Sequence, residues 1–109
     1  RLRGPLSALR LEPVLGREPR VVIGTVATGD QFVNDEAVRR NLRADLGAHA
    51  VEMEGAAVAQ IAEHFDVPCL VIRAVSDLAG RESEIDFARF VDEVAVNSVA
   101  VSRVVLDLL

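Results

Sequence analysis

Three short apolar runs alternate with three segments of helical periodicity along this chain. The runs are residues 20–28, 48–51 and 69–75. A near-continuous apolar run of this length is typical of a strand that is buried on both faces. Strands joined by helices usually pair in parallel, so the order strand, helix, strand, helix, strand, helix predicts an α/β domain. We expect a mainly parallel or mixed sheet between two layers of helices, which is a three-layer αβα arrangement.

The three helical segments carry recognisable start and stop signals. The first begins at Asn34 or Asp35, either of which can cap a helix, and it stops at Gly47 after apolar residues spaced four apart. The second covers about residues 54–64, with apolar side chains at helical spacing. The third is a long helix that begins near Asp86. These helices can cover the faces of the sheet.

The sheet predicted from this chain is incomplete. Three strands of this kind leave at least one edge without a neighbour, and bare edges expose unpaired backbone groups. Residues 1–19 contain no long periodic element, and the chain has no initiator Met. We therefore expect a cut or renumbered chain, in which residues 1–19 are an irregular lead-in or the remnant of a missing amino-terminal part. Residues 20–109 form the rest, which a missing segment or a partner completes.

Composition excludes several functional classes. With 109 residues, 50% of them hydrophobic and 27% charged, the chain fits one small globular domain. Its net charge is -5 and its 12 basic residues form no stripe, so nucleic acid is not an expected partner. Apolar runs stop far short of the roughly 20 residues that cross a bilayer, so we expect no membrane association. The single Cys69 suits a reducing compartment, and we interpret the protein as cytoplasmic.

Two carboxylates follow apolar strands, at the sheet edge where open α/β sheets bind ligands. Glu54 opens the second helix, where it can accept hydrogen bonds from a sugar diol, or where it can be an ordinary first-turn glutamate. Asp77 leaves the third strand before a loop of small residues. It can act as a general acid if partial burial raises its pKa, or it can be a loop aspartate.

Arg73 stands inside the third apolar run, where a buried guanidinium needs a carboxylate partner. Glu52 and Glu54, at the end of the preceding strand, are the natural candidates. The alternative is that Arg73 reaches solvent at an edge of the sheet.

Phe32 lies in the connection between the first strand and its helix, at the same predicted edge. Its ring can stack on a planar base, whose edge the backbone of Val33 could then read, or it can staple the start of the following helix. Cys69 has the pattern of a small core residue, and the two histidines lack the spacing of metal ligands. Glycine-rich phosphate loops are absent from the sequence, so we expect neither a metal nor a cofactor.

Four segments, taken together and in order, resemble the nucleoside phosphorylase and nucleosidase superfamily, and within it the 5′-methylthioadenosine/S-adenosylhomocysteine nucleosidases most of all. They are Thr28-Gly29-Asp30-Gln31-Phe32-Val33, Val51-Glu52-Met53-Glu54-Gly55-Ala56-Ala57, Phe65-Asp66-Val67-Pro68 and Arg73-Ala74-Val75-Ser76-Asp77. The resemblance covers about residues 20–109. It implies a nucleoside phosphorylase-like fold, of which residues 20–109 are the carboxyl-terminal part.

The resemblance also implies roles for the substrate-binding residues. Phe32 would stack on adenine, and the backbone of Val33 would bind the edge of the base. Met53 would pack on the ribose, and Glu54 would hold its hydroxyls.

For the chemistry, the resemblance implies that Asp77 protonates purine N7 as the glycosidic bond breaks. Ser76 and the backbone of Ala79 would orient Asp77, while Glu52 and Arg73 would support the site from behind.

The expected activity is hydrolysis of the N-glycosidic bond of adenine thio-nucleosides by a larger enzyme, which the resemblance implies is a homodimer. In that family the glutamate that activates water comes from the amino-terminal part, and no matching motif is present in this chain. We therefore expect the isolated fragment to be inactive. The alternatives are a related futalosine hydrolase or purine nucleoside phosphorylase, or a half-domain that binds nucleosides or assembles without catalysis.

Overall fold

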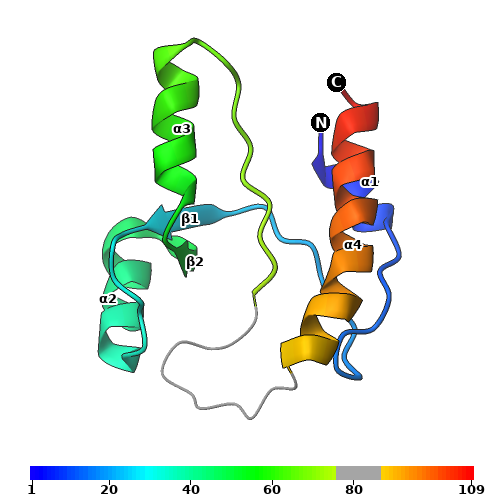
Figure 1. The fold of residues 1–109 in the computed structure, drawn as a ribbon, viewed down its shortest axis with the longest axis horizontal. Coiled ribbons are helices and arrows are strands. Elements are labelled where there is room, and N and C mark those ends of the chain that lie inside the picture. Colours follow the sequence, from blue (N-terminus) through cyan, green and yellow to red (C-terminus); the bar gives the residue numbers. More distant parts are fainter. Residues whose placement is uncertain (76–86) are drawn as a thin grey trace. The chain divides into compact units, whose positions relative to one another are not determined.

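The computed structural model describes residues 1–75 and 87–109, which divide into two compact units. One unit is Gly24–Ser83, and the other combines Arg1–Ile23 with Glu84–Leu109. Figure 1 shows the elements in chain order. They are α1 (Arg3–Ala8), β1 (Thr25–Thr28), α2 (Glu36–Leu46), β2 (Ala48–Glu52), α3 (Gly55–His64) and α4 (Phe87–Asp107).

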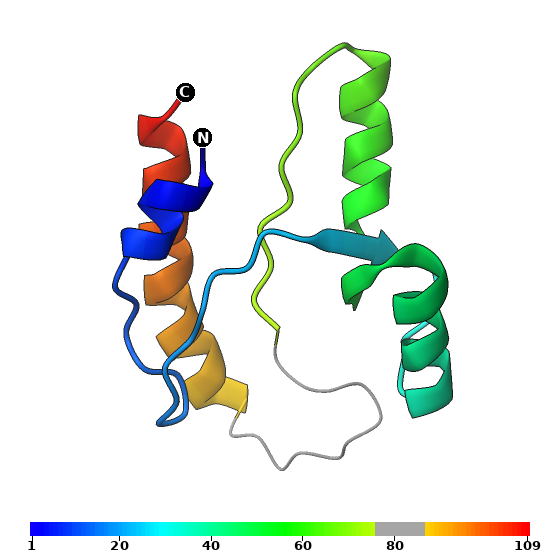
Figure 2. The ribbon, with the colours of Figure 1, turned by 180° about the vertical axis from the view of Figure 1, so that it is seen from behind.

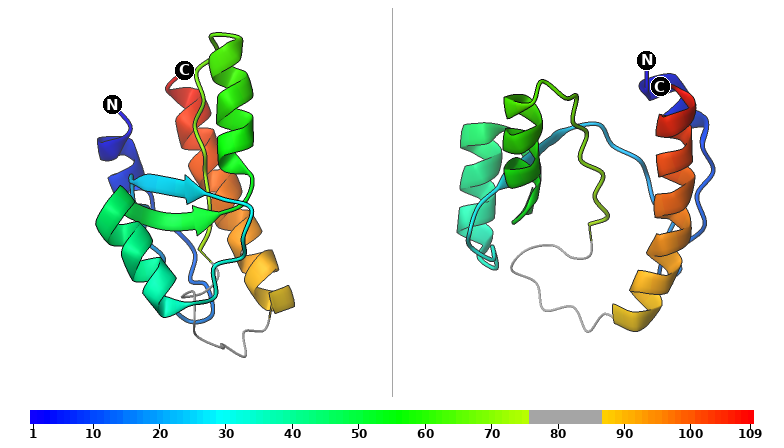
Figure 3. Two further views of the ribbon diagram at one scale, coloured as in Figure 1. Left: turned by 90° about the vertical axis from the view of Figure 1, so that its left-hand side faces the viewer. Right: turned by 45° about the horizontal axis from the view of Figure 1, so that its top comes forward.

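The unit Gly24–Ser83 is built on a parallel pair of strands, β1 and β2, which lie side by side in Figure 3. Helix α2 connects them and packs against β2, and α3 packs against β1. The register pairs Thr28 with Glu52, so both strands end level at the same edge. The predicted α/β class and the parallel pairing of these two strands are confirmed.

Helix α2 has the boundaries that its capping residues predict. The Asp35 carboxylate accepts hydrogen bonds from the backbone N–H groups of Ala37 and Val38, at 2.8 and 3.0 Å. At the other end Gly47 adopts a left-handed conformation, with φ 64°, which a residue without Cβ takes at little cost. The guanidinium of Arg43 donates to the carbonyls beyond the last turn. Both ends of this helix are thus satisfied by local chemistry.

The prediction of a third strand at residues 69–75 is wrong for this structure, since the segment forms none. Likewise, the first apolar run contributes only Thr25–Thr28 to the sheet. An apolar run shows that a segment needs cover, whereas a strand also needs a neighbour that completes its hydrogen-bond ladder. Cys69 is exposed rather than a core residue, because no strand carries it into a sheet.

In the other unit α1 lies beside the carboxyl-terminal part of α4, as Figure 2 shows. Leu6 and Phe90 are buried. The buried side chain of Asn97 accepts a hydrogen bond from the backbone N–H of Glu12 at 2.8 Å and donates to its carbonyl at 2.9 Å. One amide therefore satisfies both backbone groups of a residue far away in the sequence.

The segment after Glu12 turns tightly at Leu15 and Gly16, whose φ angles are 50° and 76°. Two positive φ values in succession match the central residues of a type I′ turn. The backbone N–H of Leu15 donates to the Glu93 carboxylate at 2.5 Å. This hydrogen bond, followed by the one from Arg89, lowers the pKa of Glu93 below its ordinary value.

Few side chains of the described residues are buried. The buried apolar residues among them are Leu6, Ala48 and Phe90, whereas α3 leaves Val58 and Ile61 exposed. The α/β fold is therefore incomplete in this chain, as predicted. None of the helices in the described part combines the length and the apolar character that a membrane-spanning segment needs.

Candidate functional site

The carboxyl edge of the β1–β2 pair carries a partly buried carboxylate, that of Glu52. Glu52 is the last residue of β2, and its side chain is only 10% exposed. The backbone N–H of Gly29 donates to the Glu52 carbonyl at 3.2 Å, which continues the ladder past the end of β1. This pairing holds the Glu52 backbone beside the loop that follows β1.

Both oxygens of the Glu52 carboxylate accept hydrogen bonds. Oε1 accepts from the hydroxyl of Thr28, directly opposite on β1. Oε2 accepts from the backbone N–H groups of Glu54 and Gly55, at 3.0 and 2.7 Å. A Cβ at Gly55 would stand 2.9 Å from Oε1, so glycine is the residue that lets this carboxylate approach the start of α3.

Arg73 joins the two glutamates of the edge. Its Nη2 atom lies 2.5 Å from Glu52 Oε2 and 3.2 Å from Glu54 Oε2. Both predicted carboxylate candidates thus contact Arg73, whose side chain is 39% exposed: the expectation of a buried guanidinium is wrong, and Arg73 reaches solvent as well. A guanidinium between two carboxylates offsets their mutual repulsion and fixes the direction of both side chains.

These contacts lower the pKa of Glu52 to about 2. The hydrogen bond from Thr28 contributes most, followed among the lowering effects by the backbone N–H groups of Glu54 and Gly55 and the charge of Arg73, while burial acts in the opposite direction. Glu52 is consequently ionised at every physiological pH, and it acts as a fixed anion rather than a proton carrier.

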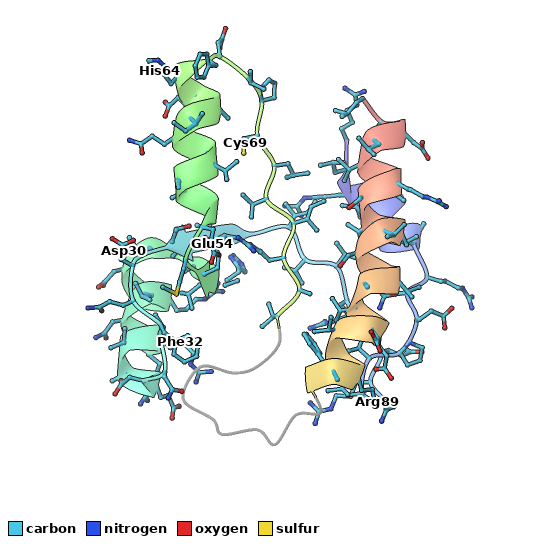
Figure 4. The ribbon with its side chains drawn as sticks, viewed as in Figure 1. Asp30, Phe32, Glu54, His64, Cys69 and Arg89 are labelled. Carbon is cyan, nitrogen blue, oxygen red and sulfur yellow. The ribbon has the colours of Figure 1, made fainter. Side chains whose placement is uncertain are left out.

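A cavity of about 700 Å³ opens at this edge. Its lining includes six residues that the sequence analysis assigned to the site: Phe32, Val33, Glu52, Met53, Glu54 and Arg73. Glu54 has a side chain that is 69% exposed, and Phe32 is 74% exposed, so both are accessible to a ligand. Figure 4 labels Glu54 beside the strands and Phe32 near α2. The structure thus brings these six predicted residues to one cavity.

The residues that line the cavity include more basic than acidic side chains, whereas the whole chain has a negative net charge. Helix α2 contributes Arg39, Arg40 and Arg43, which with Arg73 make four guanidinium groups against the two carboxylates of Glu52 and Glu54. The whole chain has a net charge of -5. An anionic group on a bound ligand therefore meets a surplus of positive charge here.

Three predicted site residues, Ser76, Asp77 and Ala79, lie outside the described residues. Conversely, sequence reasoning missed Thr28 and Gly55 as contacts of Glu52. The signal for Thr28 was the parallel register, which places the ends of the two strands opposite each other. The three arginines of α2 were missed as well, although their spacing of three and four residues places them on one face of a helix.

In the described ranges 1–75 and 87–109, no group of three or more His, Cys, Asp or Glu side chains could hold a metal ion. The two histidines make other contacts, although His49 also lines the cavity. His49 accepts the backbone N–H of Thr25 at 3.1 Å through Nδ1, and the ring of His64 meets that of Phe65 edge to face.

Comparison with known proteins finds similar sequences in several bacteria. The chain is 57% identical over 94 residues to a 5′-methylthioadenosine/S-adenosylhomocysteine nucleosidase of Mycobacterium bovis, which covers 86% of this chain and 36% of the relative. It is 49% identical over 80 residues to the enzyme of the same name from Bacillus subtilis, covering 72% of this chain and 35% of the relative.

An aminodeoxyfutalosine nucleosidase of Campylobacter jejuni is 41% identical over 97 residues, covering 89% of this chain and 41% of the relative. The chain thus spans about a third of the length of the first two relatives. No solved structure matches it. The sequence profile of the phosphorylase superfamily matches residues 4–109, and because this match includes nearly every residue, the chain belongs to the phosphorylase superfamily.

Proposed function

We propose that this chain is the carboxyl-terminal part of an enzyme that hydrolyses the N-glycosidic bond of 5′-methylthioadenosine and S-adenosylhomocysteine. The observation that carries the proposal is the 57% identity over 94 residues to a nucleosidase named for these two substrates. The meeting of Phe32, Met53 and Glu54 at one cavity supports it. Residues 20–109 would belong to the catalytic domain, and residues 1–19 would lead into it.

In this proposal Glu54 binds the ribose hydroxyls. Its carboxylate is exposed at the cavity and contacts Arg73 through Oε2, which leaves acceptor positions for two hydroxyl groups. Met53, which is 42% exposed, offers a polarisable surface to the sugar. Phe32 stacks on adenine, and the backbone of Val33 bonds the edge of the base.

The bond cleavage requires a proton donor for the leaving base. In this proposal Asp77, oriented by Ser76 and the backbone of Ala79, donates a proton to N7 of adenine. The C1′–N9 bond then breaks, and its electron pair leaves with the base. A water molecule adds through its oxygen to C1′ and gives its proton to a general base. The glutamate that would activate this water has no counterpart among the matched residues, so residues 1–109 alone should not turn over substrate.

A second candidate is the cleavage of aminodeoxyfutalosine. The Campylobacter jejuni relative named for it matches more of this chain than the Bacillus subtilis enzyme does, 89% against 72%. Both candidate reactions break an N-glycosidic bond, so the roles proposed for Glu54 and Asp77 are the same in each. The two differ in the substituent that the substrate carries beyond the ribose.

We also propose a homodimeric enzyme of the cytoplasm. The unpaired thiol of Cys69 suits a reducing compartment. Light scattering of the complete protein tests the dimer, and a monomeric mass would contradict it.

The function is tested on the complete protein with methylthioadenosine, S-adenosylhomocysteine and aminodeoxyfutalosine, by measuring the release of adenine. We expect cleavage without phosphate and a free sugar as product. A strict need for phosphate with release of a sugar 1-phosphate would replace hydrolysis by phosphorolysis. Asp77→Asn should abolish turnover and keep binding, and full activity in that variant would overturn the role of Asp77.

A further inference from the structure

Helix α3 begins with a residue that does not cap it. Glu54 is at the N-cap position, yet its side chain makes no capping hydrogen bond. At this position a side chain ordinarily accepts an N–H group of the first turn, which otherwise has no partner within the helix. The N–H groups at the start of α3 must therefore be satisfied by other groups.

Two strand residues take over the capping. Glu52 accepts the N–H groups of Glu54 and Gly55, and the hydroxyl oxygen of Thr28 accepts that of Ala56 at 3.0 Å. The helix start is thus held by the ends of β1 and β2. The Glu54 carboxylate takes no part in the capping; it lines the cavity, where Arg73 contacts it at 3.2 Å.

The Thr28 hydroxyl has a defined direction in this arrangement. Since its oxygen accepts the N–H of Ala56, its single proton is directed to Glu52 Oε1. The other carboxylate oxygen of Glu52, Oε2, accepts a hydrogen bond from Arg73 at 2.5 Å. Thr28 is not among the residues that line the cavity, so a change at Thr28 would reach Glu54 through Glu52 and Arg73.

We propose that Thr28 is a positioning residue for ribose binding: its hydroxyl fixes Glu52, which both caps α3 and holds Arg73 against Glu54. This inference rests on the proposed function, in which Glu54 accepts the ribose hydroxyls. In this proposal Thr28, at the end of β1, affects how tightly the sugar of the ligand is bound and does not affect the binding of its base. A purely structural role would instead weaken the binding of every ligand alike.

The test compares two ligands in the complete protein, with Asp77→Asn as the common background so that the ligands are bound but not cleaved: adenosine, which has the ribose diol, and 2′,3′-dideoxyadenosine, which lacks it. Thr28→Val removes the hydroxyl and keeps the approximate shape, whereas Thr28→Ser keeps the hydroxyl. Thr25→Val is the matched control on the same strand, because the Thr25 side chain has no hydrogen bond to the part of the chain that the structure describes, and the contact of Thr25 with His49 uses its backbone N–H.

Isothermal titration gives the ratio of the two dissociation constants for each variant. We expect a preference for adenosine in the wild type, in Thr28→Ser and in Thr25→Val. In Thr28→Val this preference should fall by roughly tenfold, because the Glu54 carboxylate is no longer held in place to accept hydrogen bonds from the ribose hydroxyls. An unchanged preference in Thr28→Val, or a preference lost in Thr28→Ser, would overturn the positioning role. If wild type itself shows no preference for the diol, the proposed function of Glu54 fails instead.

A second variant covers the case in which Thr28→Val does not fold. Gly55→Ala places a methyl group 2.9 Å from Glu52 Oε1 and so displaces the same carboxylate from the other side. We expect the same loss of the diol preference, and a full preference retained by a folded Gly55→Ala protein would contradict the proposal. The Glu52 carboxyl signal in nuclear magnetic resonance provides a readout without ligand, since its pKa should rise in Thr28→Val and stay low in Thr28→Ser.

Discussion

Gly55 lies so close to Glu52 that a Cβ atom on it would stand 2.9 Å from the carboxylate oxygen Oε1. Gly55 is also the first residue of α3, where alanine would ordinarily favour the helix. The contact reverses that preference, because the added methyl group and a carboxylate bound on both oxygens cannot occupy the same space.

Gly55→Ala should therefore lower the free energy of unfolding by about 1–3 kcal/mol, the usual cost of overpacking. Gly4→Ala is the matched control, because Gly4 also lies in the first turn of a helix and a Cβ there would meet no atom within 4 Å. Chemical denaturation followed by circular dichroism measures both. Equal effects of the two substitutions would contradict the close approach of Glu52.

The ionisation of Glu52 predicts how stability changes with pH. Its pKa is lowered to about 2 in the folded chain, whereas an unfolded glutamate has an ordinary value near 4.5. The stabilisation is therefore fully present above about pH 4.5 and is lost as the pH falls towards 2, because the unfolded state then binds the proton more readily. Denaturation midpoints between pH 2 and 7 measure this loss.

Glu52→Gln should remove much of that dependence. Part of it should remain, because the pKa of Glu93 is also lowered, by the hydrogen bond from Leu15 and then by Arg89. Glu93→Gln is the control for this second contribution. A Glu52→Gln protein with the full pH dependence of the wild type would show that Glu52 is not the group responsible.

The cap of α2 predicts a local loss of stability. Asp35→Ala removes the acceptor of two backbone N–H groups and should cost about 1 kcal/mol, while Asp35→Asn should cost less because it keeps an acceptor. Asp45→Ala, near the other end of the same helix, is the control. Thermal unfolding compares the three variants, and an effect of Asp45→Ala as large as that of Asp35→Ala would argue against the cap.

The basic lining of the cavity predicts a preference for anionic ligands. Adenosine 5′-monophosphate should bind more tightly than adenosine, and this advantage should shrink as salt screens the arginines. Arg40→Gln should reduce the advantage, whereas Arg103→Gln on α4, outside the lining, should not. Titration of both ligands at two ionic strengths gives the ratio of their dissociation constants. If this ratio is the same in Arg40→Gln and Arg103→Gln, Arg40 does not contribute to the binding of the phosphate.

The helices of the parallel unit could be predicted from sequence because their signals are local. The residues around Asp35 and Gly47 carry their own hydrogen-bond partners and backbone preferences, so the bounds of α2 follow from the chain itself. The ion pairs of Arg73 with Glu52 and Glu54 were also predicted, although the premise of a buried guanidinium in a strand is wrong, since the Arg73 side chain is 39% exposed.

The remaining features of the fold and the site depend on contacts between distant segments, which the pattern of residues along the sequence does not specify. The run 69–75 has the apolar pattern of a strand, but a strand also needs a hydrogen-bonding neighbour, and the segment has no strand structure here. The hydrogen bond from Thr28 to Glu52 depends on the register of β1 against β2, which a pattern of residue types does not give. The roles of Ser76, Asp77 and Ala79 stay predictions.

The transfer of helix capping from Glu54 to two strand residues separates folding from recognition at this position. The Glu54 side chain takes no part in capping α3, so its exchange should leave the start of this helix intact. In the proposed function, substitutions at position 54 are therefore free to change the preference for the sugar in directed evolution. Substitutions at Thr28 or Glu52 are not, because every change there alters the scaffold and the recognition site at once.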